Sequence, residues 1–180
     1  MLEKTKSADL STQGRVDLLN KRSRTKLEFC ISSKCEDGLH ILFWDFDMIE
    51  KHFVLRSLSQ VQNFHQLGNI YVIKSRHGFN AFCLDKLFLN EAYNVLFYSR
   101  WNDFNHVRIG FKSESWALKL SQDKKIILRL APTDNGIERE QSNAHYQFFK
   151  KFFNFKGLEI NKKKDIYDDI QLESYEQHKV

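Results

Sequence analysis

The sequence is poor in the residues that break a chain or link it covalently. Its 180 residues include 7 glycines, 1 proline and 3 cysteines. Cys30, Cys35 and Cys83 cannot all pair with one another, and no second ligand pair accompanies them as a zinc module requires. We therefore expect reduced thiols, as in cytosolic proteins.

Long apolar runs and glycine-rich loops are also missing. No stretch approaches the roughly 18 apolar residues of a membrane span, and the first residues lack the pattern of a signal peptide. The absence of a glycine-rich phosphate loop argues against Rossmann and Walker-type nucleotide sites. We expect a cytoplasmic protein that is not exported and has no membrane partner.

Apolar side chains and an excess of positive charge are what the chain does contain. Hydrophobic residues make up 42% of it and aromatic residues 14%, enough for one core. The net charge of +5 suits a polyanionic partner, although scattered lysines also form ordinary solvated surface. Composition predicts a flexible arm over residues 1–25 (or a short helix near 14–20), one domain over 26–156 and a flexible charged tail over 157–180.

Hydrophobic periodicity predicts strands and helices in the central domain. Alternating or continuous apolar patterns indicate strands at residues 27–31, 40–46, 69–75, 79–84, 106–112, 116–121 and 126–130. Helical spacing marks residues 48–65, 89–98 and 143–153. In the first of these, we expect the apolar face to be formed by Ile49, Phe53, Leu58, Val61 and Phe64. We expect 40–46 to be a central strand and the last three strands to complete its sheet as a meander. The order predicts an α+β fold, a mixed but largely antiparallel sheet flanked by helices.

Two aspartates end the most apolar of these strands. Asp45 and Asp47 are two residues apart, so their side chains point to the same face. Neighbouring carboxylates repel unless a cation neutralises them, and oxygen ligands of this kind suit Mg²⁺ or Mn²⁺. The pair can also be explained as caps of the helix that begins near Met48, where the helix dipole favours negative charge.

A polar turn follows at residues 75–80. Arg76 and His77 are candidates for binding a triphosphate, Ser75 for hydrogen bonding to it, and Gly78 for close approach of the backbone. The alternative interpretation of the same residues is an ordinary hairpin turn with exposed polar side chains.

The order of these features resembles the archaeo-eukaryotic primase superfamily, which includes small primase subunits and the primase-polymerases of plasmids and viruses. Residues 44–47, Trp-Asp-Phe-Asp, are similar to its first acidic motif. Residues 74–84 are similar to its serine-containing turn and the strand that follows. Asp103, ahead of residues 106–121, resembles the third acidic position before a basic strand. The likeness spans about residues 39–125.

The resemblance implies an RRM-like primase-polymerase palm and a metal-dependent nucleotidyltransferase that makes or extends primers in DNA replication. The catalytic residues that would bind Mg²⁺ or Mn²⁺ are Asp45, Asp47 and Asp103. The nucleotide-binding residues would be Ser75, Arg76, His77, Asn80, Arg108 and Lys119. Partners would be a DNA template or primer, nucleoside triphosphates and a replication subunit or helicase.

One position departs from the family pattern and keeps other interpretations open. Asn80 stands where many relatives have a histidine, and an amide carries no positive charge. A non-catalytic nucleic-acid-binding replication protein on the same fold is therefore the alternative, with a generic binding domain behind it. A rolling-circle initiator would need two histidines around one hydrophobic residue, which the chain lacks. Trp44, Trp101 and Trp116 are candidates for base stacking or for the core, and the core is favoured for Trp44.

Overall fold

The structure is a computed structural model that describes residues 16–17, 28–121, 124–132 and 139–153. Its elements in chain order are β1 (Val16–Asp17), β2 (Glu28–Ser32), β3 (His40–Asp47), α1 (Lys51–His65), β4 (Ile70–Lys74), β5 (Gly78–Leu87), α2 (Leu89–Tyr98), α3 (Phe104–Lys112), β6 (Ala117–Ser121), β7 (Lys125–Leu130) and α4 (Asn143–Phe153). The predicted α+β class with antiparallel strands flanked by helices is confirmed, but the strands form two sheets where one was predicted.

Two antiparallel sheets share the strands. One has the order β1-β2-β6 and the other the order β3-β5-β4-β7. The predicted meander is wrong, because β6 pairs with β2 whereas β7 pairs with β4. Most of the predicted arm and the whole predicted tail lie outside the described residues, and Val16–Asp17 forms β1 in place of the short helix considered there.

Strand β3 is an edge strand, which corrects its predicted central position. Within its sheet it pairs with β5 alone, yet Ile41, Leu42, Phe43 and Trp44 have no exposed surface. An apolar run of this kind indicates burial on both faces but says nothing about neighbouring strands. Other segments close the open edge of β3. One of them contains Ser33, whose carbonyl accepts a hydrogen bond from the N–H of Ile41 in β3 at 2.9 Å.

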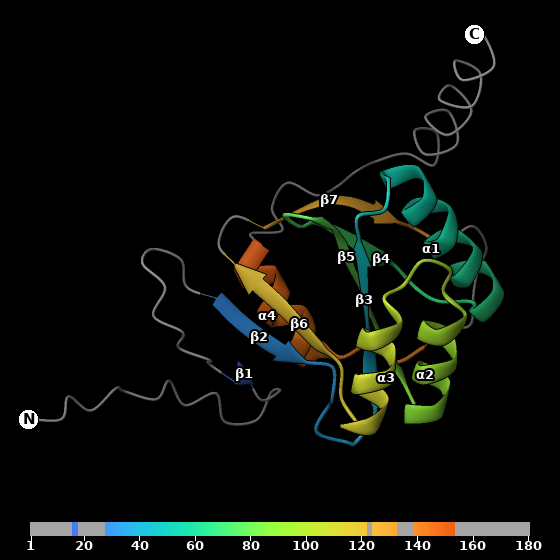
Figure 1. The fold of residues 1–180 in the computed structure, drawn as a ribbon. Coiled ribbons are helices and arrows are strands. Elements are labelled where there is room, and N and C mark those ends of the chain that lie inside the picture. Colours follow the sequence, from blue (N-terminus) through green and yellow to red (C-terminus); the bar gives the residue numbers. More distant parts are fainter. Residues whose placement is uncertain (1–15, 18–27, 122–123, 133–138, 154–180) are drawn as a thin grey trace, which may run out of the picture.

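Helices cover both faces of the four-stranded sheet. Figure 1 shows α1, α2 and α3 on one side of β3 and α4 on the other. From α4, the ring of Phe149 stacks on Phe82 of β5 with centroids 4.0 Å apart and meets Phe43 edge-on. Burying aromatic rings of this size is a large part of the free energy that holds a helix on a sheet.

The first long helix is shorter than predicted, and only part of its predicted apolar face is buried. It begins at Lys51 and not at Met48, and it ends as predicted at His65, after which Gln66 adopts a left-handed conformation with φ of 52°. Phe53 and Phe64, predicted to face the core, are 40% and 83% exposed. Leu58 and Val61 are buried as predicted, and Val54 joins them in the stripe that faces the core.

Residues 106–112 form helix α3 and not the predicted strand. The side chain of Asp103 caps the helix by accepting a hydrogen bond from the backbone N–H of Asn105 at 2.9 Å. Val107 and Gly110, three residues apart, form the buried stripe, while Ile109 is 58% exposed. The alternating apolar residues of this segment are typical of a strand, but the cap and the burial of residues at helical spacing stabilise a helix.

None of the helices in the described part of the chain has the length and apolar character of a membrane span.

The three cysteines are unpaired, as predicted. Burial raises the pKa of the Cys35 thiol and, more strongly, that of Cys83. Buried thiols of this kind are poor nucleophiles and poor metal ligands.

Candidate functional site

The site begins with the pairing of β3 and β5, which sets three pairs of residues on one face in order. Phe43 lies opposite Phe82, then Asp45 opposite Asn80, then Asp47 opposite Gly78. The helix α4 covers the aromatic pair. Farther along the strands the face becomes polar, and Asp45 is left partly buried and Asp47 exposed.

The third carboxylate comes from the segment that closes the open edge of β3. The backbone N–H of Asp103 donates to the carbonyl oxygen of Asp45 at 2.8 Å. Asn102, the residue before it, accepts the N–H of Asp45 on its side-chain oxygen at 3.0 Å and donates to the carbonyl of Leu96. One turn into α3, the Nε2–H of His106 donates to the Phe43 carbonyl at 3.0 Å. These bonds use the backbone groups that a neighbouring strand would otherwise satisfy.

Asp45, Asp47 and Asp103 are therefore brought together. One carboxylate oxygen from each lies within 4.8 Å of the others. Burial raises the pKa of the Asp45 carboxyl, and the charges of Asp47 and Asp103 raise it further, against a lowering by His106 and Lys124. Three hard oxygen ligands at this spacing fit Mg²⁺ or Mn²⁺, whose charge would relieve the repulsion.

Asn80 lies directly over the acidic cluster. Its amide nitrogen donates to Oδ1 of Asp45 at 2.7 Å, and its amide oxygen accepts from Nζ of Lys124 at 2.7 Å. The same ammonium donates to the carbonyl of Lys119 at 2.6 Å. Asn80 is 7% exposed, so it acts as a fixed link between the Lys124 ammonium and the Asp45 carboxylate.

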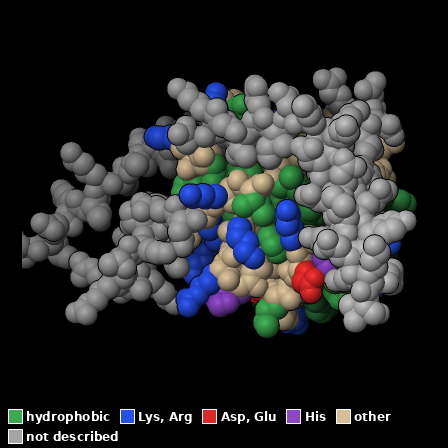
Figure 2. Space-filling view, turned by 90° about the horizontal axis from the view of Figure 1, so that it is seen from above, with side chains coloured by type: hydrophobic (Ala, Val, Ile, Leu, Met, Phe, Trp, Pro, Cys, Tyr) green, Lys and Arg blue, Asp and Glu red, His purple; other side chains and the backbone are tan. Residues whose placement is uncertain are grey.

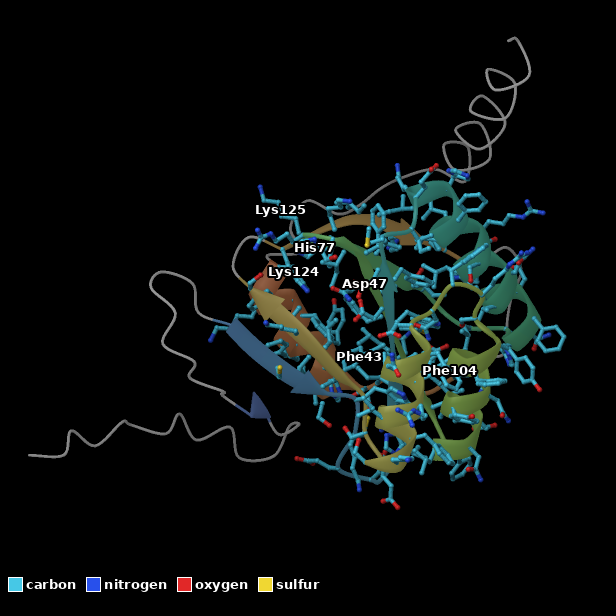
Figure 3. The ribbon with its side chains drawn as sticks, viewed as in Figure 1. Phe43, Asp47, His77, Phe104, Lys124 and Lys125 are labelled. Carbon is cyan, nitrogen blue, oxygen red and sulfur yellow. The ribbon has the colours of Figure 1, made fainter. Side chains whose placement is uncertain are left out.

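The turn between β4 and β5 lies beside the end of β3. The N–H of Ser75 donates to the carbonyl of Gly78 at 3.0 Å and closes the turn, and the N–H of Met48 donates to the carbonyl of His77 at 2.8 Å. Gly78 is required here because a Cβ at this position would collide with the Phe46 carbonyl oxygen. Figure 3 shows Asp47, His77 and Lys124 close to one another at the upper end of the two sheets.

An open groove of about 890 Å³ runs between the two sheets over these residues. It is lined by Trp44, Asp45, Asp47, Lys74, Ser75, Arg76, His77, Asn80, His106, Ala117, Leu118, Lys119, Ser121, Lys124, Lys125 and Ile127. Five of these are Lys or Arg and two are Asp. Seen from above, Figure 2 shows Lys and Arg side chains gathered on the described part of this face, with an acidic side chain among them. The groove therefore offers an anionic ligand a positive wall beside a compact acidic cluster.

Most predicted site residues line this groove, and two, Asp103 and Arg108, do not. Ser75, Arg76, His77, Asn80 and Lys119 are all among its walls. Arg108 is not: it was placed on a strand facing the cleft, but it lies exposed on helix α3.

Sequence reasoning missed Lys124 and Asn102, which the structure places at the centre of the site. Nothing in the local sequence marked Lys124, since it belongs to a run of charged residues after β6. The signal for Asn102 was its position before a helix-capping Asp103, which went unrecognised because a strand was expected there.

No protein-family model matches this chain, and no curated protein or solved structure matches it either. The function therefore has to be argued from the site alone.

Proposed function

We propose that this protein is a metal-dependent nucleotidyltransferase of the primase-polymerase kind, acting in DNA replication on a primase-polymerase-like palm. The observation that carries the proposal is the meeting of Asp45, Asp47 and Asp103 in one cluster, of which Asp45 and Asp47 line a basic groove. A carboxylate cluster alone is common on protein surfaces. A cluster that includes a partly buried carboxylate and opens onto five cationic side chains is suited to bringing metal and phosphate together.

The residues divide into two groups in this proposal. Asp45, Asp47 and Asp103 hold Mg²⁺ or Mn²⁺, which would neutralise phosphate charge and activate the attacking 3′-hydroxyl. Arg76 and His77, on the turn across from Asp47, bind the triphosphate. The remaining groove cations from β6 and the β6–β7 connection, Lys119 and Lys124, face the nucleotide or the primer-template.

The alternative is a non-catalytic nucleic-acid-binding protein of replication on the same fold. Asn80 favours it, because both ends of its amide are bonded within the protein and it is uncharged. In the catalytic proposal, Lys124 supplies the positive charge that Asn80 lacks. Its ammonium is one hydrogen-bonded residue away from Asp45.

The test is primer synthesis and primer extension on single-stranded DNA with labelled nucleotides, in Mg²⁺ and in Mn²⁺. Asp45→Asn and Asp103→Asn should each lower synthesis by at least about a thousandfold, since each removes a metal ligand near the reacting phosphate. Glu36→Gln, which removes an exposed carboxylate from the turn before β3, is the matched control and should keep full activity.

A second measurement separates the two candidate functions. Mn²⁺ should raise the Tm of the unchanged protein and of Glu36→Gln, but not that of Asp45→Asn or Asp103→Asn. Synthesis that survives both aspartate substitutions would refute the catalytic proposal. DNA binding without synthesis by the unchanged protein, in either metal, would support the non-catalytic alternative.

A further inference from the structure

A second, smaller pocket lies where helix α1 meets the α2–α3 connection. It has a volume of about 60 Å³ and is lined by Phe53, Arg56, Ser57, Gln60, Arg100 and Trp101. In Figure 1 this connection passes between α1 and β3. Enclosed small-molecule sites usually measure about 300 to 1,000 Å³, so this pocket suits one unit of a longer ligand and not a whole cofactor.

Trp101 lines this pocket, and its backbone is strained. Its φ is 69°, a conformation that residues other than glycine adopt rarely. The connection is held in place by the Ser57 hydroxyl, which donates to the Arg100 carbonyl at 2.6 Å, and by the Asn102 N–H, which donates to the Ser99 carbonyl. The indole is 44% exposed, so core burial does not account for this strain.

The groups around the indole are aromatic and cationic. The ring of Phe53, itself 40% exposed, lies 5.8 Å from the Trp101 ring, and the Arg100 guanidinium lies 4.9 Å from it. Arg56 adds a second guanidinium to the rim. Among the described residues, no carboxylate is paired with Arg56 or Arg100. An exposed indole beside the Arg100 guanidinium, with Arg56 lining the same pocket, provides a flat surface for a base and donors for the adjoining phosphates.

We infer that this pocket binds single-stranded nucleic acid, with a base stacked on Trp101 and the flanking phosphates contacted by Arg56 and Arg100. Only Asn102 separates Trp101 from Asp103 in the chain. A strand held on Trp101 therefore lies near the acidic cluster. Its role as a template rests on the proposed function, whereas the binding itself does not.

Tryptophan fluorescence tests the inference directly. The chain has 3 tryptophans, and Trp44 and Trp116 have no exposed surface. A base that stacks on Trp101 should quench the exposed indole alone. Titration with oligo(dT), in EDTA and without triphosphates, should give saturable quenching that is absent in Trp101→Ala.

Affinities of the variants are measured by the anisotropy of a labelled oligo(dT). Loss of one stacked base should weaken binding about tenfold or more in Trp101→Ala, and Trp101→Phe should recover most of that loss. Arg56→Gln and Arg100→Gln should each reduce the slope of log affinity against log salt concentration by about 0.7. Phe64→Ala, which removes another exposed ring from α1, is the control and should bind as the unchanged protein does.

Unchanged affinity in Trp101→Ala, or unchanged salt slopes in both arginine variants, would overturn the inference. So would equal quenching by free mononucleotides or by duplex DNA. The arginine variants keep the test decisive if Trp101→Ala fails to fold. Quenching without synthesis by the unchanged protein would refute the proposed function alone, and synthesis with unaltered Trp101→Ala binding would refute the pocket alone.

Discussion

The backbone N–H of Asp103 donates to the carbonyl oxygen of Asp45 across 2.8 Å, joining the start of helix α3 to the open edge of strand β3. This one bond explains how residues 58 positions apart in the chain share a site. It also uses a carbonyl that an edge strand would otherwise expose to water or to another chain. The third acidic residue is thus placed by the same contact that protects the sheet.

Asn102 should be the residue that positions the acidic cluster without belonging to it. Its side chain links the Asp45 N–H to the Leu96 carbonyl. Asn102→Ala leaves both groups unpaired, which should lower the free energy of unfolding by about 1–3 kcal/mol. Replacing a residue that supports a metal ligand usually lowers the metal affinity by about 10- to 100-fold, and we expect the Mn²⁺ affinity of Asn102→Ala to be lower by a factor in that range.

Calorimetric titration with Mn²⁺ and urea unfolding measure these two effects. Asn94→Ala, on the exposed face of α2, is the control and should change neither quantity by much. Mn²⁺ affinity that stays intact in Asn102→Ala would mean that Asp103 keeps its place without this link.

Asp45 should destabilise the metal-free fold at neutral pH. Burial and its acidic neighbours raise the pKa of the Asp45 carboxyl above its ordinary 3.8, so the folded protein binds this proton more tightly than the unfolded chain. The stabilising contribution is complete below about pH 3.8 and is lost as the pH rises through the raised pKa. Asp45→Asn keeps the hydrogen-bonding shape without the charge, so its Tm in EDTA at pH 7 should exceed that of the unchanged protein.

Divalent metal should reverse that order. At about 100 times its Kd, a bound ion adds about 2.7 kcal/mol to the stability of a protein that can bind it. Thermal unfolding with and without Mn²⁺ measures the crossover. A lower Tm for Asp45→Asn in EDTA would contradict the expected cost of the ionised carboxylate.

Gly78 should be far less replaceable than Gly38. A Cβ on Gly78 would collide with the carbonyl oxygen of Phe46 in the paired strand, so Gly78→Ala should separate β5 from β3 beside Asp47 and cost about 3 kcal/mol or more. Gly38 has a φ of 81° but open space around it, and Gly38→Ala should cost only about 1–2 kcal/mol. Urea unfolding of both variants tests the difference, and equal losses would show that the close approach at Gly78 is easily relieved.

His145 should make stability depend on pH in the weakly acidic range. Its Nε2–H donates to the Ser32 carbonyl at 2.8 Å, so in the neutral ring Nδ1 accepts from the Ser142 hydroxyl at 2.7 Å. Burial lowers the pKa of this imidazole below its ordinary 6.5. The unfolded chain therefore binds the proton more tightly, and stability is complete above about pH 6.5 and falls as the pH drops through the lowered pKa.

Urea unfolding between pH 8 and pH 5 measures this slope, which is at most about 1.4 kcal/mol per pH unit for one proton. Buried His40, whose pKa is also lowered by burial, contributes in the same direction. His145→Gln should therefore reduce the slope without abolishing it. His77→Gln, at an exposed position, is the control; if both variants kept the full slope, the source would lie elsewhere.

The sequence alone determined the elements whose signals are local. Continuous apolar runs and turn residues predicted β3, β4 and β5, and the helical spacing of α2 and α4 predicted both over their observed bounds. The alternation that placed Asp45 and Asp47 on one face also follows from strand geometry, without knowledge of any neighbour.

Tertiary structure decided the rest, because it depends on which distant groups satisfy one another. The edge position of β3, the pairing of β6 with β2 and the link from Lys124 through Asn80 to Asp45 join segments that no local pattern connects. The apolar pattern of residues 106–112 predicted a strand. They form a helix because Asp103 caps it and because Val107 and Gly110 are buried together on one face. The chemistry of an apolar residue favours its burial, but the residues against which it packs depend on how the whole chain folds.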